Sequence, residues 1–96
     1  MEQLRQKYKI MPEDLLRIKA VFLEHHQGMY IPIKERTRVI ISLLLVDLLQ
    51  PSQTYTRTQV LDLFRTQVRY GEYYLTLMVN YRLVEPVGKS GLFIRC

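Results

Sequence analysis

The chain has 96 residues, of which 48% are hydrophobic and 24% are charged. This length excludes a large multidomain enzyme, and the composition excludes a disordered or fibrous protein, so we expect one compact domain with a packed core. Fourteen Lys and Arg against nine Asp and Glu give a formal net charge of +5, which favours polyanionic partners without naming one. The single cysteine, Cys96, excludes an intrachain disulfide and fits a reducing compartment such as the cytoplasm.

Motifs of catalysis and of metal binding are missing from the sequence. There is no Gly-rich phosphate loop, no His-Glu-x-x-His and no Gly-x-Ser-x-Gly. The neighbours His25 and His26 would point about 100° apart on a helix and have no Cys nearby, so a metal site is not expected. The longest apolar run, Val39 to Leu49, is shorter than the roughly 20 residues that span a bilayer. We therefore expect a non-enzymatic cytoplasmic protein without cofactor, metal or membrane contact.

The N-terminal third predicts an arm and a helix. Residues 1–12 are polar and basic and are expected to form a flexible arm, which leaves residues 13–96 as a single domain. The first helix is expected from about Glu13 to Gln27, because Pro12 suits a first turn and acidic residues follow it. Gly28 is then expected to cap the end of this helix in the left-handed conformation.

A second helix is expected from Lys34 or Glu35 to about Gln50, where Pro51 stops it. Its apolar residues surround the helix axis, and a helix that is apolar all round must be covered all round. We expect a two-fold homodimer to bury the surplus surface. The alternative is that the N-terminal helix of the same chain covers it. The residues expected in the dimer interface are Ile40, Leu44 and Leu48.

The C-terminal half predicts two more helices and a hairpin. A short extended piece around Tyr55 leads into Thr56, which forms a capping-box pattern with Gln59 and starts a third helix over residues 57–68. Gly71 separates it from a fourth helix over residues 72–81. Two short apolar runs then flank the turn Gly88-Lys89-Ser90-Gly91, which is typical of a β-hairpin.

This order of elements predicts a mainly α fold with a small β-hairpin, namely a winged helix-turn-helix with an extra N-terminal helix. The fourth helix would then face the major groove of DNA, and the hairpin would lie on the flanking backbone. The function that follows is that of a small DNA-binding or transcription-associated regulator.

Candidate contact residues fall into two groups. The basic group would contact phosphates, and the other group lies on the exposed side of the fourth helix. That side carries no Lys or Arg, and Glu72 would repel phosphate, so we expect salt-sensitive backbone contact with little reading of bases. The alternative function is a protein–protein interaction module on the same scaffold. The candidates are Lys34, Arg36, Arg38, Arg57, Arg69 and Lys89 for phosphates, and Tyr73, Thr76 and Asn80 for bases.

A set of residues spread over about residues 28–95 matches the pattern of a known family. These residues are Gly28, Ile31, Pro32, Lys34, Arg36, Arg38, Tyr55, Thr56, Val60, the run Met78-Val79-Asn80-Tyr81-Arg82-Leu83, and Phe93. In them the chain resembles an uncharacterised bacterial winged-helix-like domain family that is associated with helix-turn-helix regulators. This resemblance implies a winged-helix fold and a role beside a regulator, and it carries over no activity. Leu75 and Thr76 depart from the family, which usually has two adjacent arginines there.

Overall fold

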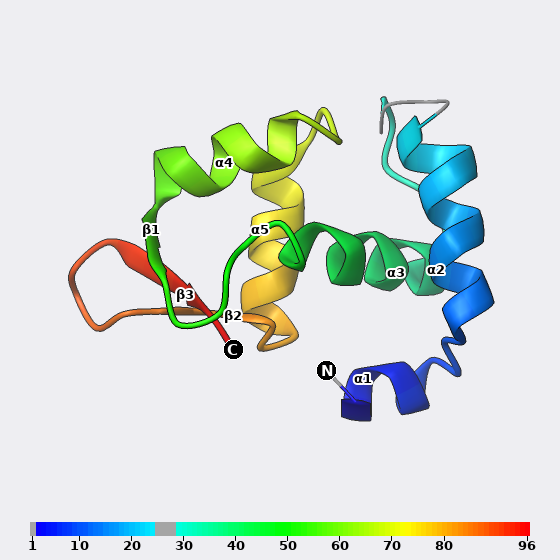
Figure 1. The fold of residues 1–96 in the computed structure, drawn as a ribbon, viewed down its shortest axis with the longest axis horizontal. Helices are drawn as coiled ribbons and strands as arrows, with labels where there is room; N and C mark the ends of the chain where they lie inside the picture. Colours follow the sequence, from blue (N-terminus) through cyan, green and yellow to red (C-terminus); the bar gives the residue numbers. More distant parts are fainter. Residues whose placement is uncertain (1, 25–28) are drawn as a thin grey trace.

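The computed structural model describes residues 2–24 and 29–96, which form helices and a three-stranded antiparallel sheet (Figure 1). The fold is therefore mixed α and β, with one more strand than the expected hairpin. Gly28, His25 and His26, for which a helix cap and a metal site were considered, lie outside the described residues. The elements in chain order are α1 (Glu2–Lys7), α2 (Pro12–Ile18), the π-helix η1 (Lys19–Glu24), α3 (Glu35–Val46), β1 (Thr54–Thr56), α4 (Arg57–Arg65), α5 (Gly71–Asn80), β2 (Val84–Pro86) and β3 (Leu92–Arg95).

The sheet has the strand order β1-β3-β2, so the last strand of the chain lies in the middle. The expected hairpin is confirmed: β2 and β3 pair antiparallel, with Glu85 opposite Ile94. Gly88 and Gly91 in its turn have φ values of 53° and 76°, which side chains rarely tolerate. The extended piece before α4 is the third strand, because Tyr55 pairs with Phe93 of β3.

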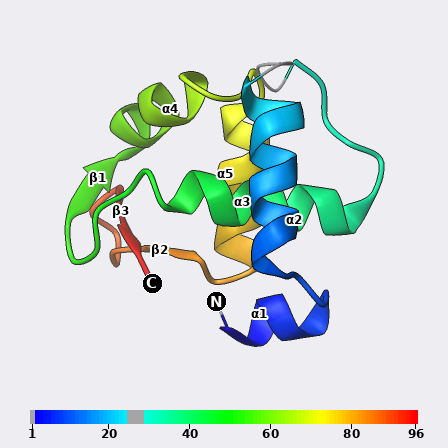
Figure 2. The ribbon, with the colours of Figure 1, turned by 45° about the vertical axis from the view of Figure 1, so that its right-hand side comes forward.

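Helix α3 forms the centre of the core. It lies between α2 and α5 (Figure 2), and its buried residues are Val39, Ile40, Ile41, Ser42, Leu43, Leu45 and Val46. The expected surplus of apolar surface is thus covered within one chain, by α5 as well as by the N-terminal helix. The α-helix ends at Val46 instead of Gln50, because tight turns follow in which Leu48 and Leu49 donate to carbonyls three residues earlier.

The C-terminal strand is fastened to the end of α3. The Arg95 guanidinium donates to the carbonyl of Leu49 at 3.0 Å and to the Asp47 carboxylate at 3.0 Å. This arginine is mostly buried, with 16% of its side chain exposed, so its charge is used inside the fold. It holds the central strand of the sheet against the helix that precedes β1.

Helices α4 and α5 follow the sequence pattern closely. The capping box is confirmed, since the Gln59 N–H donates to Thr56 Oγ1 at 3.1 Å and the Thr56 N–H donates to Gln59 Oε1 at 2.9 Å. α4 ends at Arg65, three residues before the expected end, and α5 begins at Gly71. A Cβ at Gly71 would lie 3.4 Å from Phe64 Cβ, so a small residue suits the close approach of the two helices.

The N-terminal segment contains an unexpected helix. Instead of an arm without regular structure, residues 2–7 form α1, and Ile10 after it is 7% exposed in the core. The next helix begins at Pro12, and from Lys19 it continues as η1. Short helices such as α1 are marginal alone, so tertiary contacts must stabilise it.

We expect Tyr74→Phe to stabilise the protein. The Tyr74 side chain in α5 is 1% exposed, and its hydroxyl has no hydrogen-bond partner among the described residues. Burial raises the pKa of this phenol, which therefore stays neutral. An unpaired buried hydroxyl costs about 1–3 kcal/mol, so its removal should raise the free energy of unfolding by roughly 1 kcal/mol or more in denaturant titrations.

The matched control for Tyr74→Phe is Tyr55→Phe. The Tyr55 hydroxyl accepts a hydrogen bond from the Gln50 N–H at 2.8 Å, so its removal should lower the free energy of unfolding by about 1 kcal/mol. A loss of stability in Tyr74→Phe equal to that in Tyr55→Phe would contradict the prediction, because it would mean that the Tyr74 hydroxyl is paired.

Candidate nucleic-acid interface

The exposed side of α5 is a neutral strip with one acidic end. Glu72, Thr76 and Asn80 are exposed at intervals of four residues, whereas Tyr74 and Met78 on the opposite side are buried. The Thr76 hydroxyl donates to the Glu72 carbonyl at 3.1 Å. α5 itself contains no Lys or Arg, as the sequence indicates. We call Glu72, Thr76 and Asn80 the α5 strip.

Two arginines lie at the N-terminal end of α5. Arg65 and Arg69 line a hollow of about 480 Å³ together with Tyr70, Gly71, Glu72 and Tyr73. The Arg69 guanidinium lies 5.7 Å from the centre of the Tyr70 ring, which leaves its charge available. Arg65 is 3.6 Å from Asp62, but both side chains are more than half exposed, so this pair is weak.

Tyr73, which the sequence offers for stacking on bases, is half-buried. Its ring packs edge-on against Tyr74, with a centroid distance of 5.3 Å and an interplanar angle of 81°. Part of the ring is thus committed to the core, which is the more common role of aromatic residues at helical spacing. It borders the α5 strip, and only part of its ring is open to a ligand.

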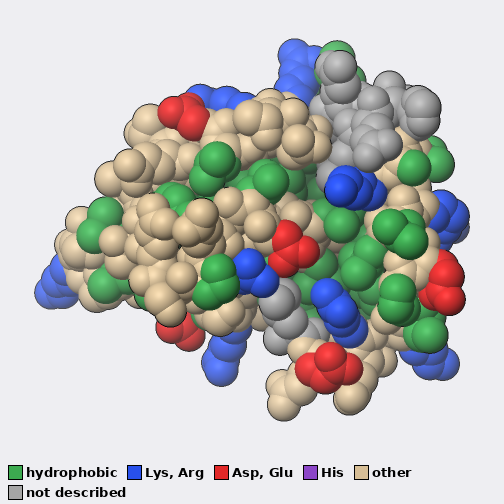
Figure 3. Space-filling view, in the orientation of Figure 1, with side chains coloured by type: hydrophobic (Ala, Val, Ile, Leu, Met, Phe, Trp, Pro, Cys, Tyr) green, Lys and Arg blue, Asp and Glu red, His purple; other side chains and the backbone are tan. Residues whose placement is uncertain are grey.

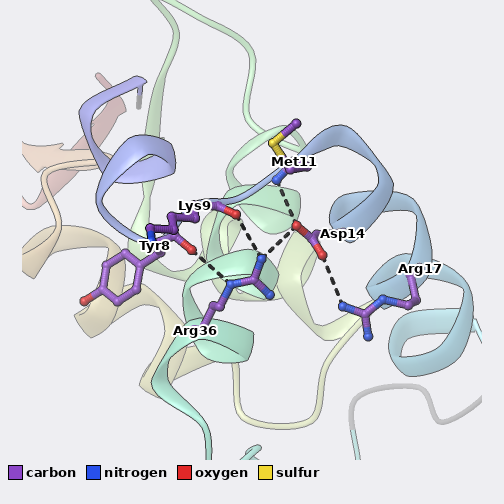
Figure 4. Close-up of polar contacts among 6 residues, drawn as sticks. All are labelled: Tyr8, Lys9, Met11, Asp14, Arg17 and Arg36. Carbon is purple, nitrogen blue, oxygen red and sulfur yellow. Dashed lines mark hydrogen bonds and ion pairs between the residues drawn. The ribbon is translucent and has the colours of Figure 1, made fainter.

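Arg36 is engaged inside the chain (Figure 4). Its Nε donates to the carbonyl of Tyr8 at 2.9 Å, and its Nη2 donates to the carbonyl of Lys9 at 3.0 Å and to Asp14 Oδ2 at 2.8 Å. The start of α3 therefore holds both the segment after α1 and the first turn of α2. We call these contacts the Arg36 tether. The Arg36 guanidinium is thus occupied by acceptors of its own chain instead of being open to phosphates.

Arg38 is engaged in the same way. Its Nη1 donates to the carbonyls of Pro32 and Ile33, and its side chain is half-buried. It thereby closes the turn that leads into α3. Lys34 in that turn stays exposed, so of the three cations expected near the start of α3 it alone keeps an open ammonium group.

Two carboxyls near the Arg36 tether have a pKa below the ordinary value. The hydrogen bond from the Met11 N–H, followed by those from Arg36 and Arg17, lowers the pKa of Asp14. Hydroxyl donors from Tyr8 and Tyr81 lower the pKa of Glu35. A carboxyl with a lowered pKa stabilises the fold where it is ionised, and this contribution is lost as the pH falls through its folded-state pKa. The N-terminal contacts should therefore weaken in acid.

The remaining expected cations lie apart. Arg57 begins α4, at the opposite end of that helix from Arg65, and exposed Lys89 lies in the turn between β2 and β3. In the face shown in Figure 3, Lys and Arg appear singly among Asp and Glu, without a continuous basic surface. The fold also brings Arg65 to the N-terminal end of α5, and Lys7 and Arg82 to its C-terminal end. Helical spacing in the sequence does not predict this placement.

The expected dimer residues do not form one surface. Ile40 is completely buried in the chain's own core, and only Leu44 and Leu48 are partly exposed, beside Lys19 and Asp47. Hydrophobic side chains instead reach the surface on the α2 side of the molecule (Figure 3). Leu16 there is 70% exposed. A symmetric contact through Ile40 is therefore wrong for this fold.

Comparison with protein-family models, curated proteins and solved structures found no match. Within residues 2–24 and 29–96, no helix is long and apolar enough to cross a membrane. The same described residues contain no cluster of three or more His, Cys, Asp or Glu that would hold a metal ion.

Proposed function

We propose that the chain is a small winged-helix protein that binds DNA and acts in transcription regulation. The observation that carries this proposal is the element order α3-β1-α4-α5-β2-β3 together with the sheet order β1-β3-β2. In a winged helix-turn-helix, the helix in the position of α5 enters the major groove, and the hairpin lies against the backbone. Here the α5 strip faces solvent, and Lys89 lies at the hairpin tip.

The contact is dominated by phosphates. Asn80 is suited to a bidentate contact with adenine, and the Thr76 methyl is suited to contact with a thymine methyl. Two such contacts give little base-sequence specificity. Arg69, which precedes α5 in the sequence, and Lys89, which follows it, are both exposed. Neither forms an ion pair with an acidic residue among the described residues. Such contacts give salt-sensitive affinity that depends little on base sequence.

Electrophoretic mobility shift on a generic duplex tests this function. A shift at low salt that disappears at high salt is expected, and each phosphate contact adds about 0.9 to the slope of log affinity against log salt. Arg69→Gln combined with Lys89→Gln should lower that slope by roughly 2. The control Asn80→Ala should leave the slope unchanged on generic DNA. No shift of the native chain at low salt would overturn the proposal.

The second candidate function is a protein-interaction module on the same scaffold. The absence of Lys and Arg from α5, together with the acid Glu72, favours it, because such a strip suits a protein surface better than a phosphate backbone. α3 offers little apolar surface for such a contact, because Leu44 is its one partly exposed apolar residue and the partly buried Leu48 lies just beyond its end. Absence of any DNA shift would favour this function.

A homodimer is part of the proposal, with its contact on the outer face of α2 and η1 instead of α3. Leu16 and Val21 are 70% and 53% exposed on these helices, and Glu13 and Arg17 are exposed beside them. In an antiparallel two-fold pairing, Glu13 of one copy approaches Arg17 of the other twice over, which suits a self-complementary interface. Light scattering tests it: a monomeric native chain overturns the dimer, and Leu16→Glu should convert a dimer to monomer.

A further inference from the structure

α1 is fixed beside the C-terminal end of α5. The Tyr8 and Tyr81 hydroxyls both donate to Glu35 Oε1, at 2.8 and 2.9 Å, and their rings meet edge-on with centroids 6.4 Å apart. The Arg36 tether holds the same segment through the carbonyls of Tyr8 and Lys9. Figures 1 and 2 both show α1 below the point where α5 ends and the chain turns into β2.

This arrangement creates a hollow with two cations. The hollow is about 340 Å³ and is lined by Gln3, Leu4 and Lys7 from α1 and by Tyr81 and Arg82 from the end of α5. None of the lining residues is acidic. Arg82 is exposed, and no described residue forms an ion pair with it. Glu35 contacts one of the lining residues, Tyr81, and its carboxylate accepts hydrogen bonds from both phenolic hydroxyls.

A second basic hollow lies on the other side of α1. Arg5 and Lys9 line it, with Glu2 as its only acid, and the Arg5 Nε has no hydrogen-bond partner among the described residues. Each of the two hollows beside α1 therefore carries a net positive charge. We call Lys7 and Arg82 the α1 corner, because they share the hollow that touches α5.

The α1 corner places positive charge at the end of α5 that lacked it. α5 has 10 residues and is about 15 Å long, and Arg65 and Arg69 lie at its N-terminal end. The major groove is about 12 Å wide, with a phosphate backbone along each rim. A neutral helix with cations beyond both ends can therefore reach both rims while its middle faces the bases.

We propose that the α1 corner is a phosphate-binding surface for duplex DNA, with Lys7 and Arg82 contacting the backbone at the C-terminal end of α5. This proposal rests on the proposed DNA-binding function and adds an element, α1, that lies outside the helix-turn-helix and the hairpin. The tether matters because it positions Lys7 before binding, so less side-chain and backbone freedom is lost on contact.

The test compares two double variants that remove the same charge. Lys7→Gln with Arg82→Gln changes the α1 corner, and Lys9→Gln with Lys19→Gln changes exposed cations that lie outside it. For the first, the slope of log affinity against log salt should fall by roughly 2, because two phosphate contacts are lost. The second should keep the native slope. Lys7→Gln alone should give about half of the effect.

Each outcome separates this surface from the proposed function. If the native chain binds DNA and the α1 corner variant keeps the native slope, the α1 corner is wrong and the function stands. If both double variants lower the slope equally, only net charge matters and the α1 corner is again wrong. If the native chain shows no shift at low salt, both proposals fail. Thermal unfolding of the variants should match the native chain, since both replaced side chains are exposed.

Discussion

Ile40→Ala is expected to lower the free energy of unfolding by about 2–5 kcal/mol, because it empties a fully enclosed site in the central helix. Ile40 is 0% exposed, and α3 is packed between α2 and α5, so the surroundings have little room to close the cavity. Small domains have a total stability of about 5–15 kcal/mol, so this loss is a large share. Urea titration followed by circular dichroism measures it.

Leu48→Ala is the matched comparison for Ile40→Ala. Leu48 lies just after α3 and is only partly buried, so its truncation should cost clearly less. Suppose instead that Ile40→Ala had the same urea midpoint as the native protein and that light scattering showed a dimer converted to a monomer. Ile40 would then belong to an interface. That result would contradict the packing of α3 described above.

Arg36→Met is expected to have the second largest effect and to act on one end of the molecule. The substitution removes the donors to the Tyr8 and Lys9 carbonyls and to Asp14, while its apolar stem still packs. Hydrogen bonds from a charged donor contribute about 1.5–3 kcal/mol, so the free energy of unfolding should fall by roughly 1–3 kcal/mol because the site is partly exposed. Residues 2–10 should also exchange their amide hydrogens faster.

Acid provides the control for the Arg36 tether. The pKa of Asp14 is lowered in the folded state, so protonation of Asp14 in acid removes one of the three acceptors of Arg36. The difference between native protein and Arg36→Met should therefore shrink as the pH falls through this lowered pKa. A difference that stays constant down to full protonation would show that the ion pair with Asp14 contributes nothing.

Local signals predict the elements of this chain well. The Thr56–Gln59 capping box and the Gly88–Gly91 turn act over a few residues, and both appear as expected. The pairing of β1 with β3 does not follow from such signals, because Tyr55 and Phe93 are far apart in sequence. The same holds for α1, whose stability depends on Arg36, more than 25 residues later.

The candidate site also has features that local sequence predicts and features that depend on distant contacts. The lack of basic residues on α5 is readable from helical spacing, and the structure places Thr76 and Asn80 on its exposed strip. The sequence does not show which arginines are available to bind phosphate. Arg36 and Arg38 resemble phosphate ligands until their carbonyl partners in the fold are known. Likewise, periodicity shows that α3 must be covered but cannot tell whether α5 or a second copy covers it.

The two attachments of α3 have a mechanical consequence. Arg36 at its start holds the N-terminal segment, and Arg95 holds the last strand to the turn after its end. The first and last parts of the chain are thus joined through one buried helix. Because both are fastened to α3 or to the turn after it, a displacement of this helix would move the segment that follows Lys7 and the strand β3 together.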